Sequence, residues 1–165
     1  MAQLSQFILL FHIGSAILML AGGIGRELTR AQAARSTDIQ VVQSLLQLAG
    51  RFDRRLAIPG SNLVFVFGLL LAWLRGWPIL GFLQGAASNW LLVSLLLYLA
   101  IFPLVIFIFV PRGKLFEKTL QEAVSEGRVT SQLSAAFDDR TVRRAHIVEN
   151  ILVLSILYLM VMKPF

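Results

Sequence analysis

The sequence contains no cysteine and little charge. The lack of cysteine among its 165 residues excludes disulfides, thiolate metal ligands, iron–sulfur clusters and a thiol nucleophile. Only 15% of the residues are charged, against about 25% in an ordinary soluble domain. Hydrophobic residues make up 57%, and the mean hydropathy is +0.76. This composition favours lipid over water as the surrounding medium, so we expect an integral membrane protein.

The common sequence motifs of enzymes and transporters are also missing. There is no HExxH motif and no nucleophile–base pair, and Gly22-Gly23-Ile24-Gly25 follows no strand, so it is no nucleotide loop. The middle of each apolar stretch carries no charge for a transported solute and is interrupted only by Pro103. Any enzymatic activity would therefore depend on a bound cofactor.

What the sequence does have is four long apolar stretches. They are Leu4–Gly25, Leu56–Leu74, Asn89–Val110 and Ala145–Met162. A helix of about 20 residues crosses a ~30 Å hydrocarbon core, so each stretch can span a membrane. The sequence predicts an all-α bundle of four transmembrane helices, organised as one membrane domain over residues 1–165. We interpret the first stretch as a retained span rather than a cleaved signal peptide.

Basic residues concentrate in two of the connections between these spans. The connections 26–55 and 111–144 hold all the lysines and arginines except Arg75 and Lys163. Because positive residues stay in the cytoplasm, both connections are predicted to be cytoplasmic and both termini to face outside. The three tryptophans fall at the opposite boundary, as in an aromatic belt.

Both cytoplasmic connections are predicted to be amphipathic helices. Apolar residues recur at helical spacing from Ile39 to Ala49 and from Leu115 to Val124, with Gly50 and Gly127 as candidate ends. Thr130 is a candidate start for a further short helix. These helices either lie on the lipid headgroups or pack on each other and extend the spans.

The prolines indicate where helices begin, bend or end. Pro59 falls near the first turn of the second span, where a missing N–H costs little. Pro103 falls inside the third span and predicts a kink there. Pro111 is predicted to end the third span.

His12 is the one ionisable residue inside the first span. At about 12 Å from the outer boundary it needs a partner or a cavity. It could be the axial ligand of a haem or another tetrapyrrole, with small neighbours such as Ser15 and Gly22 leaving room for the ring. Alternatively it forms an interhelical hydrogen bond to Ser, Asn or a backbone carbonyl. Joint ligation of one haem by His12 and His146 is disfavoured, since they lie at different depths.

A second polar cluster stands where the fourth span begins. It comprises Arg143, Arg144, His146, Glu149 and Asn150. The i, i+3 spacing of the histidine and the glutamate could form half of a divalent-metal site, but no second such pair exists to complete it. A salt-bridged start of the helix, in which the glutamate pairs with an arginine, is the preferred interpretation, so we expect no metal.

Small and polar residues mark candidate helix-packing positions. Ala21 and Gly25 form a small-xxx-small pair, Gly14 continues that face one heptad earlier, and Asn62 is a polar residue within the second span. These positions favour an accessory or structural subunit whose partners are lipid and other membrane proteins or a second copy of the chain. We expect no nucleic-acid partner.

Four segments together resemble a bacterial family of predicted integral membrane proteins that is catalogued as a domain of unknown function. The segments are FHIGSAILMLAGG, PRGKLFEKTLQEAVSEGRVT, RRAHIVEN and the terminal LMVMKPF. The resemblance implies a four-helix inner-membrane protein and brings no activity with it. A fainter similarity, through the histidine of the first span, is to four-helix membrane haem and copper proteins, including the membrane-type protoporphyrinogen oxidase. That oxidase carries a basic residue in its third span, whereas Asn89–Val110 contains none.

Overall fold

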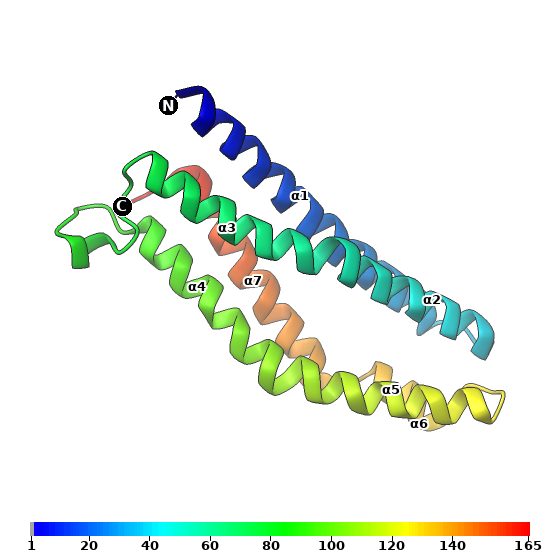
Figure 1. Cartoon of the computed structure of the whole chain (residues 1–165). Coiled ribbons are helices and arrows are strands. Elements are labelled where there is room, and N and C mark those ends of the chain that lie inside the picture. The colour runs from blue at the N-terminus through cyan, green and yellow to red at the C-terminus, as the bar shows by residue number, and fades with distance from the viewer. Residues whose placement is uncertain (1) are drawn as a thin grey trace. The chain divides into compact units, whose positions relative to one another are not determined.

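The computed structural model describes residues 2–165, which are almost entirely helical and include no strand (Figure 1). Four helical segments are long and apolar enough to cross a membrane: Gln3–Ala33, Ile39–Leu74, Trp90–Ser125 and Ser131–Met162. The prediction of an all-α fold with four spans is thus confirmed. Each segment has 31 to 36 residues, well beyond the ~20 that a bilayer requires. The helices therefore continue past the ends of their apolar stretches.

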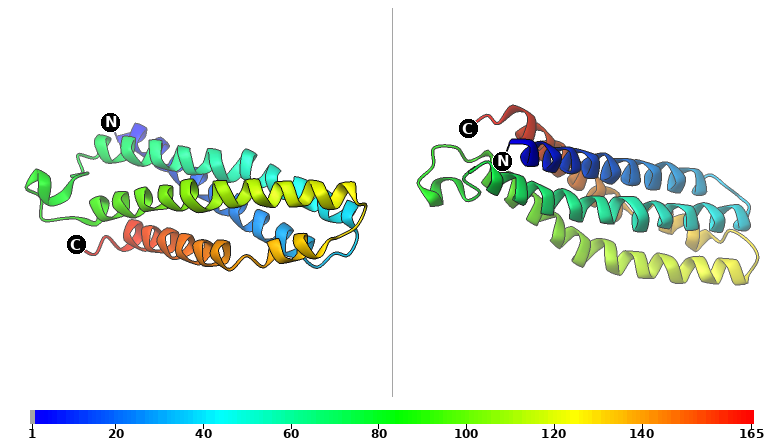
Figure 2. Two further views of the ribbon diagram at one scale, coloured as in Figure 1. Left: turned by 90° about the horizontal axis from the view of Figure 1, so that it is seen from below. Right: turned by 45° about the horizontal axis from the view of Figure 1, so that its top comes forward.

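The described residues cluster into two compact units, of which the first holds the chain up to Trp77 together with Ala123–Val129. In this unit α1 (Ala2–Ala33) packs against a long rod, as the views in Figures 1 and 2 agree. The rod is built from α2, the π-helical turn η1 and α3. Their bounds are Ile39–Phe52, Asp53–Ala57 and Ile58–Leu74. Gly50 lies inside α2, so its interpretation as a helix stop is wrong.

The second unit contains Pro78–Glu122 and Thr130–Phe165. Here α4 packs against α7, and the π-helical turn η3 also contacts α7. The helical elements are α4 (Trp90–Leu104), η3 (Val105–Phe109), α5 (Val110–Ser125), α6 (Ser131–Phe137) and α7 (Arg140–Met162). A short 3₁₀ helix, η2 (Gly81–Gln84), precedes α4.

Both predicted cytoplasmic connections are largely helical: α1, the rod and α5 run on from their spans without a break, whereas α6 is a short separate helix. Asp38 caps α2 through a side-chain oxygen that accepts from the Gln40 amide at 2.8 Å. Thr130 caps α6 by accepting from the Leu133 amide at 3.2 Å, as its position in the sequence predicts. Gly127 has a φ of 69°, the left-handed conformation expected of a residue that ends a helix. The continuous runs through α1, through α2 to α3 and through α4 to α5 extend their spans, which is one part of the second alternative that the sequence left open.

Each π-helical turn lies directly before a proline. The turn Asp53–Ala57 ends two residues before Pro59, and Val105–Phe109 ends two residues before Pro111. A proline inside a helix lacks an N–H and collides with the carbonyl four residues earlier, and the wider π-helical turn accommodates both defects. Pro111 consequently does not end its helix. The continuous helical run of α4, η3 and α5 bends where α4 passes into α5 (Figure 1), and this stretch contains Pro103 and the second π-helical turn.

Contacts of the rod with α1 continue through the first π-helical turn. They run from Asp53, which pairs with Arg26, to Ala57 beside Gly22 and then to Gly60 beside Met19. The α2 half and the α3 half of the rod therefore both pack against α1.

Candidate functional site

The His12 side chain lies between α1 and α3. Its Nδ1 is 3.0 Å from the carbonyl oxygen of Val64, and the ring packs over Gly68, where an added Cβ would meet Cε1 at 3.1 Å. A carbonyl only accepts, so Nδ1 carries the proton and the neutral ring keeps the lone pair on Nε2. This is the interhelical hydrogen bond that the sequence offered as one alternative for His12. It also fixes the orientation of the imidazole.

Residues of α1 that are buried or contact the rod recur every three or four positions from His12 onward. The set that keeps this spacing is His12, Ser15, Met19, Gly22, Arg26, Thr29 and Ala33, and Phe11 and Gly25 beside it also contact the rod. This spacing is a heptad seam. The Ser15 and Thr29 hydroxyls donate to carbonyls of their own helix, at Phe11 and Gly25, so the seam buries no unpaired hydroxyl.

The closest approach of the two helices is at Gly22 and Gly60. A Cβ on Gly22 would overlap the Ala57 backbone, coming within 2.9 Å of its Cα. A Cβ on Gly60 would lie 2.5 Å from the Met19 amide nitrogen and 2.9 Å from the Ser15 carbonyl oxygen. Only glycine permits the backbones to approach this closely. Sequence reasoning missed both positions as packing sites, although the seam that starts at His12 contains Gly22.

Of the residues that the sequence predicts as helix-packing positions, only Gly25 lies at the contact between α1 and the rod. Gly25 does pack closely, since an added Cβ would meet the Phe52 ring at 2.7 Å. Gly14 has no atom within 4 Å of such a Cβ, and Ala21 is exposed. Asn62 is also exposed, on the side of α3 that faces away from α1. The predicted face Gly14–Ala21 therefore takes no part in the contact between α1 and the rod.

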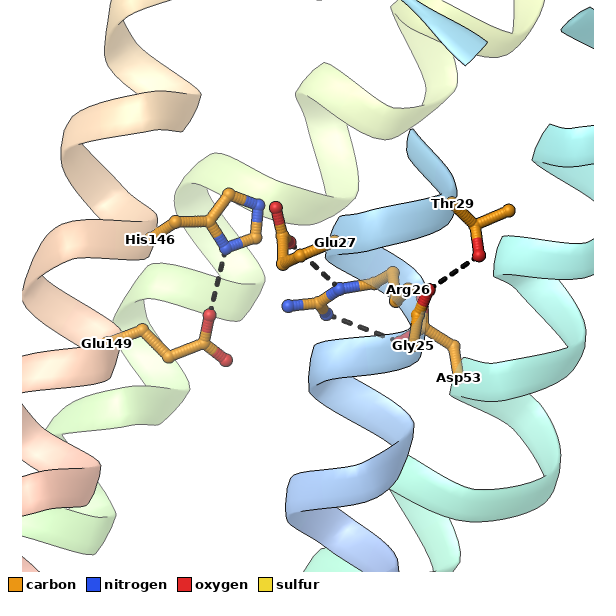
Figure 3. Close-up of polar contacts among 7 residues, drawn as sticks. All are labelled: Gly25, Arg26, Glu27, Thr29, Asp53, His146 and Glu149. Atoms are coloured by element: carbon orange, nitrogen blue, oxygen red, sulfur yellow. Dashed lines mark hydrogen bonds and ion pairs between the residues drawn. The ribbon is translucent and has the colours of Figure 1, made fainter. Parts of the chain in front are cut away.

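An ion pair joins α1 to the first π-helical turn. The Arg26 guanidinium lies 3.3 Å from Asp53 and 3.1 Å from Glu27, as Figure 3 shows. The Arg26 side chain is only 21% exposed. The two carboxylates therefore take the place of most of the water molecules that would otherwise surround the guanidinium. Neither Arg26 nor Asp53 was predicted from the sequence to form this ion pair. The available signal was that Arg26 continues the seam of His12.

The polar cluster of the fourth span separates into two pairs within the second unit. His146 Nδ1 lies 3.0 Å from Glu149 (Figure 3), and the imidazole stacks on Phe109 with ring centroids 4.5 Å apart. Arg143 pairs with Asp138 at 2.9 Å, next to the start of α7. Histidine is thus a partner of Glu149 where the sequence predicted an arginine.

The other two residues of that cluster, Arg144 and Asn150, are exposed on α7. Among residues 2–165, no group of three or more histidines and carboxylates is placed to hold a metal ion. The polar cluster thus consists of two pairs, Arg143 with Asp138 and His146 with Glu149, near the start of α7.

The terminal Lys163-Pro164-Phe165 lies against the start of α4. The Phe165 main-chain oxygen accepts from the amides of Asn89 and Trp90 at 3.0 and 3.1 Å. The Lys163 ammonium lies over the Trp90 ring, 5.3 Å from its centroid. The Asn89 side chain in turn accepts from the Phe82 amide at 2.8 Å, so the segment holds together α7, α4 and the turn before α4.

Comparison with known proteins agrees with this architecture. Residues 6–164 match the model of a family described as predicted integral membrane protein, DUF2269. Neither the comparison with curated proteins nor that with solved structures gives a match. The match covers nearly the whole chain, including the His12 seam and both polar clusters, and the protein belongs to the DUF2269 family of predicted integral membrane proteins.

Proposed function

We propose that the protein is a multi-pass subunit of the bacterial inner membrane that associates, through an outward face of its first helix pair, with other membrane proteins or with a second copy of itself. The observation that carries the proposal is Asn62. Its amide is exposed on α3, between the apolar and equally exposed Ile58 and Val66. A primary amide facing hydrocarbon leaves its donors and acceptor unsatisfied, whereas a neighbouring helix can satisfy them.

The small residues Gly14 and Ala21 on α1, of which Ala21 is exposed, support the same role. Small residues let a second helix approach closely, and this pair is not used within the helix pair itself. With the described residues offering no metal-binding group, association is the function that the arrangement supports best.

Asn62→Leu is expected to weaken association about threefold, because one interhelical hydrogen bond in a membrane contributes on average ~0.6 kcal/mol. The measurement is the fraction of complex or oligomer in native nanodiscs as a function of protein-to-lipid ratio. Asn62→Gln, which keeps a primary amide at the same position, is the matched control and should retain most of the association. A wild-type protein that stays monomeric and without partners at every ratio would contradict the proposal.

The proposed orientation rests on the arginines and lysines of residues 26–55 and 111–144. Reporter tags inserted at Ser36 and at Gly127 should both report a cytoplasmic position, and a tag at Gly85 a periplasmic one. All three sites lie in turns rather than in helices. A tag at Ser36 that reports the periplasm would reverse the orientation.

A second candidate function, tetrapyrrole binding at His12, is favoured by one specific observation. The hydrogen bond from Nδ1 to the Val64 carbonyl leaves the Nε2 lone pair for a metal, which is how metal-ligating histidines are commonly held. His12 would be the axial ligand, and Gly68 leaves the space in which its imidazole lies. A bound haem would supply redox chemistry, while the protein supplies the ligand and the apolar surroundings.

The absorption spectrum of the protein purified from haem-replete cells distinguishes the two candidates. Tetrapyrrole binding predicts a Soret band that His12→Ala abolishes and Ser61→Ala, in the second span, leaves unchanged. A colourless wild-type preparation would exclude it and leave the association proposal untouched.

A further inference from the structure

Three arginines gather on one face of the rod in the first unit. Arg51, Arg54 and Arg55 follow the i, i+3, i+4 spacing of a single helical face, and all three are exposed. Within residues 2–165 none of the three forms an ion pair or a hydrogen bond, in contrast to Arg26 on the facing helix. Asp53, the acidic residue beside them in the sequence, is already paired with Arg26. The face therefore carries three uncompensated positive charges.

The position of this face along the rod matches the edge of a bilayer. Beyond Arg55 the same side of the rod continues as exposed apolar residues, Ile58 at 55% and Val66 at 54%, and reaches Trp73 at 73%. Arg55 and Trp73 are 18 positions apart, or roughly 27 Å of helix, close to the ~30 Å thickness of the hydrocarbon core. Tryptophan prefers the interface at one side of the bilayer. The arginines consequently stand at the headgroup level of the opposite leaflet.

The remainder of α2 extends beyond that level. From Ile39 to Arg51 is a further 12 positions, or roughly 18 Å of helix. The arginines are thus not at the tip of the rod in open solvent but at the height where lipid phosphates lie. A guanidinium there can donate two parallel hydrogen bonds to one phosphate.

We propose that Arg51, Arg54 and Arg55 form a binding site for the phosphate headgroup of anionic phospholipids, in the leaflet at that end of the rod. Asn62 lies on the same side but about 10 Å closer to the bilayer centre, seven positions beyond Arg55. A helix that covers Asn62 and a headgroup beside the arginines are therefore compatible. The lipid site does not require the association proposed above.

The test is a titration of phosphatidylglycerol or phosphatidylcholine into the full-length protein in neutral detergent, with bound lipid counted by native mass spectrometry. Wild-type protein should retain phosphatidylglycerol in preference to phosphatidylcholine. Arg54→Gln with Arg55→Gln should weaken phosphatidylglycerol binding by roughly fivefold for each arginine, on the order of 25-fold together. Arg54→Lys with Arg55→Lys keeps the charge but loses the paired N–H donors, so its phosphatidylglycerol binding should fall between that of wild type and that of the double glutamine variant.

The matched control is Arg35→Gln with Arg128→Gln, which removes the same charge. Arg35 lies in the turn between α1 and α2. Arg128 lies in the turn between α5 and α6. Both are therefore beyond the ends of the helices. Arg35 is separated from the three arginines by most of α2, roughly 18 Å, more than the ~8 Å screening length of physiological salt. Binding by this variant should stay within twofold of wild type.

Equal retention of the two lipids by wild type, or an unchanged preference in the double glutamine variant, would overturn the proposal. Equal losses in the test and control variants would show non-specific attraction and also overturn it. If the double glutamine variant instead loses only its association in nanodiscs, the face is a protein contact and not a lipid site. Asn62→Leu should leave the lipid preference unchanged, which separates this result from that of the association proposal.

Discussion

Gly22→Leu is expected to destabilise the first helix pair by about 3 kcal/mol, the upper end of the range for overpacking. An added Cβ would overlap the Ala57 backbone, which cannot rotate away as a side chain can. α1 must then move away from α3, and the hydrogen bond from His12 to Val64 is lost with it. The measurement is the free energy of unfolding from a titration with sodium dodecyl sulfate in mixed micelles.

Gly23→Leu is the matched control for this experiment. The next residue along the helix has no atom within 4 Å of an added Cβ, so a leucine there meets open space. Both substitutions bring the same gain in helix propensity, about 0.8 kcal/mol over glycine, which cancels in the comparison. If the two variants were equally stable, the close contact of α1 with the rod at Ala57 would be wrong.

Asp139→Ala is expected to lower the free energy of unfolding of the second unit by about 1–2 kcal/mol. One oxygen of its carboxylate accepts from the Thr141 and Val142 amides at 2.8 and 3.3 Å, capping α7. The other lies 3.1 Å from Arg112 of α5. The alanine variant leaves both amides and Arg112 without this partner, so faster hydrogen exchange at Thr141 and Val142 should accompany the loss.

Asp138→Ala provides the comparison for the cap. Asp138 is 80% exposed and pairs only at the surface with Arg143, an arrangement that contributes at most about 1 kcal/mol. Asp139→Asn keeps an oxygen for the cap but loses the charge opposite Arg112, so it should fall between wild type and Asp139→Ala. A loss for Asp138→Ala as large as that for Asp139→Ala would remove the cap as the explanation.

The candidate sites show which inferences need a partner helix. Sequence reasoning identified His12 because an ionisable residue in an apolar helix is conspicuous without any structure. It selected Gly14 and Ala21 because they are small, but small residues occur on every side of α1. Which side is the contact depends on where α3 lies, and the close approach is at Gly22 and Gly60.

The helix ends show a similar division. The caps at Thr130 and Gly127 were predictable because they are local hydrogen-bond patterns within a few residues. Gly50 and Pro111 were not, since glycine and proline disfavour a helix locally but packing along the whole rod compensates for them. The π-helical turns that accommodate the prolines leave no simple pattern in the sequence.

The sequence by itself determined that this chain forms membrane-spanning helices, and how many, because hydropathy over about 20 residues is a property of each segment alone. It also determined the asymmetric distribution of charge between the connections. Only the tertiary structure decided that the spans continue as long helices and that the His12 seam faces the rod. It also decided that Arg26 pairs with Asp53, whereas three nearby arginines stay exposed. Those outcomes depend on which surfaces two helices, distant in sequence, present to each other, and no single segment encodes them.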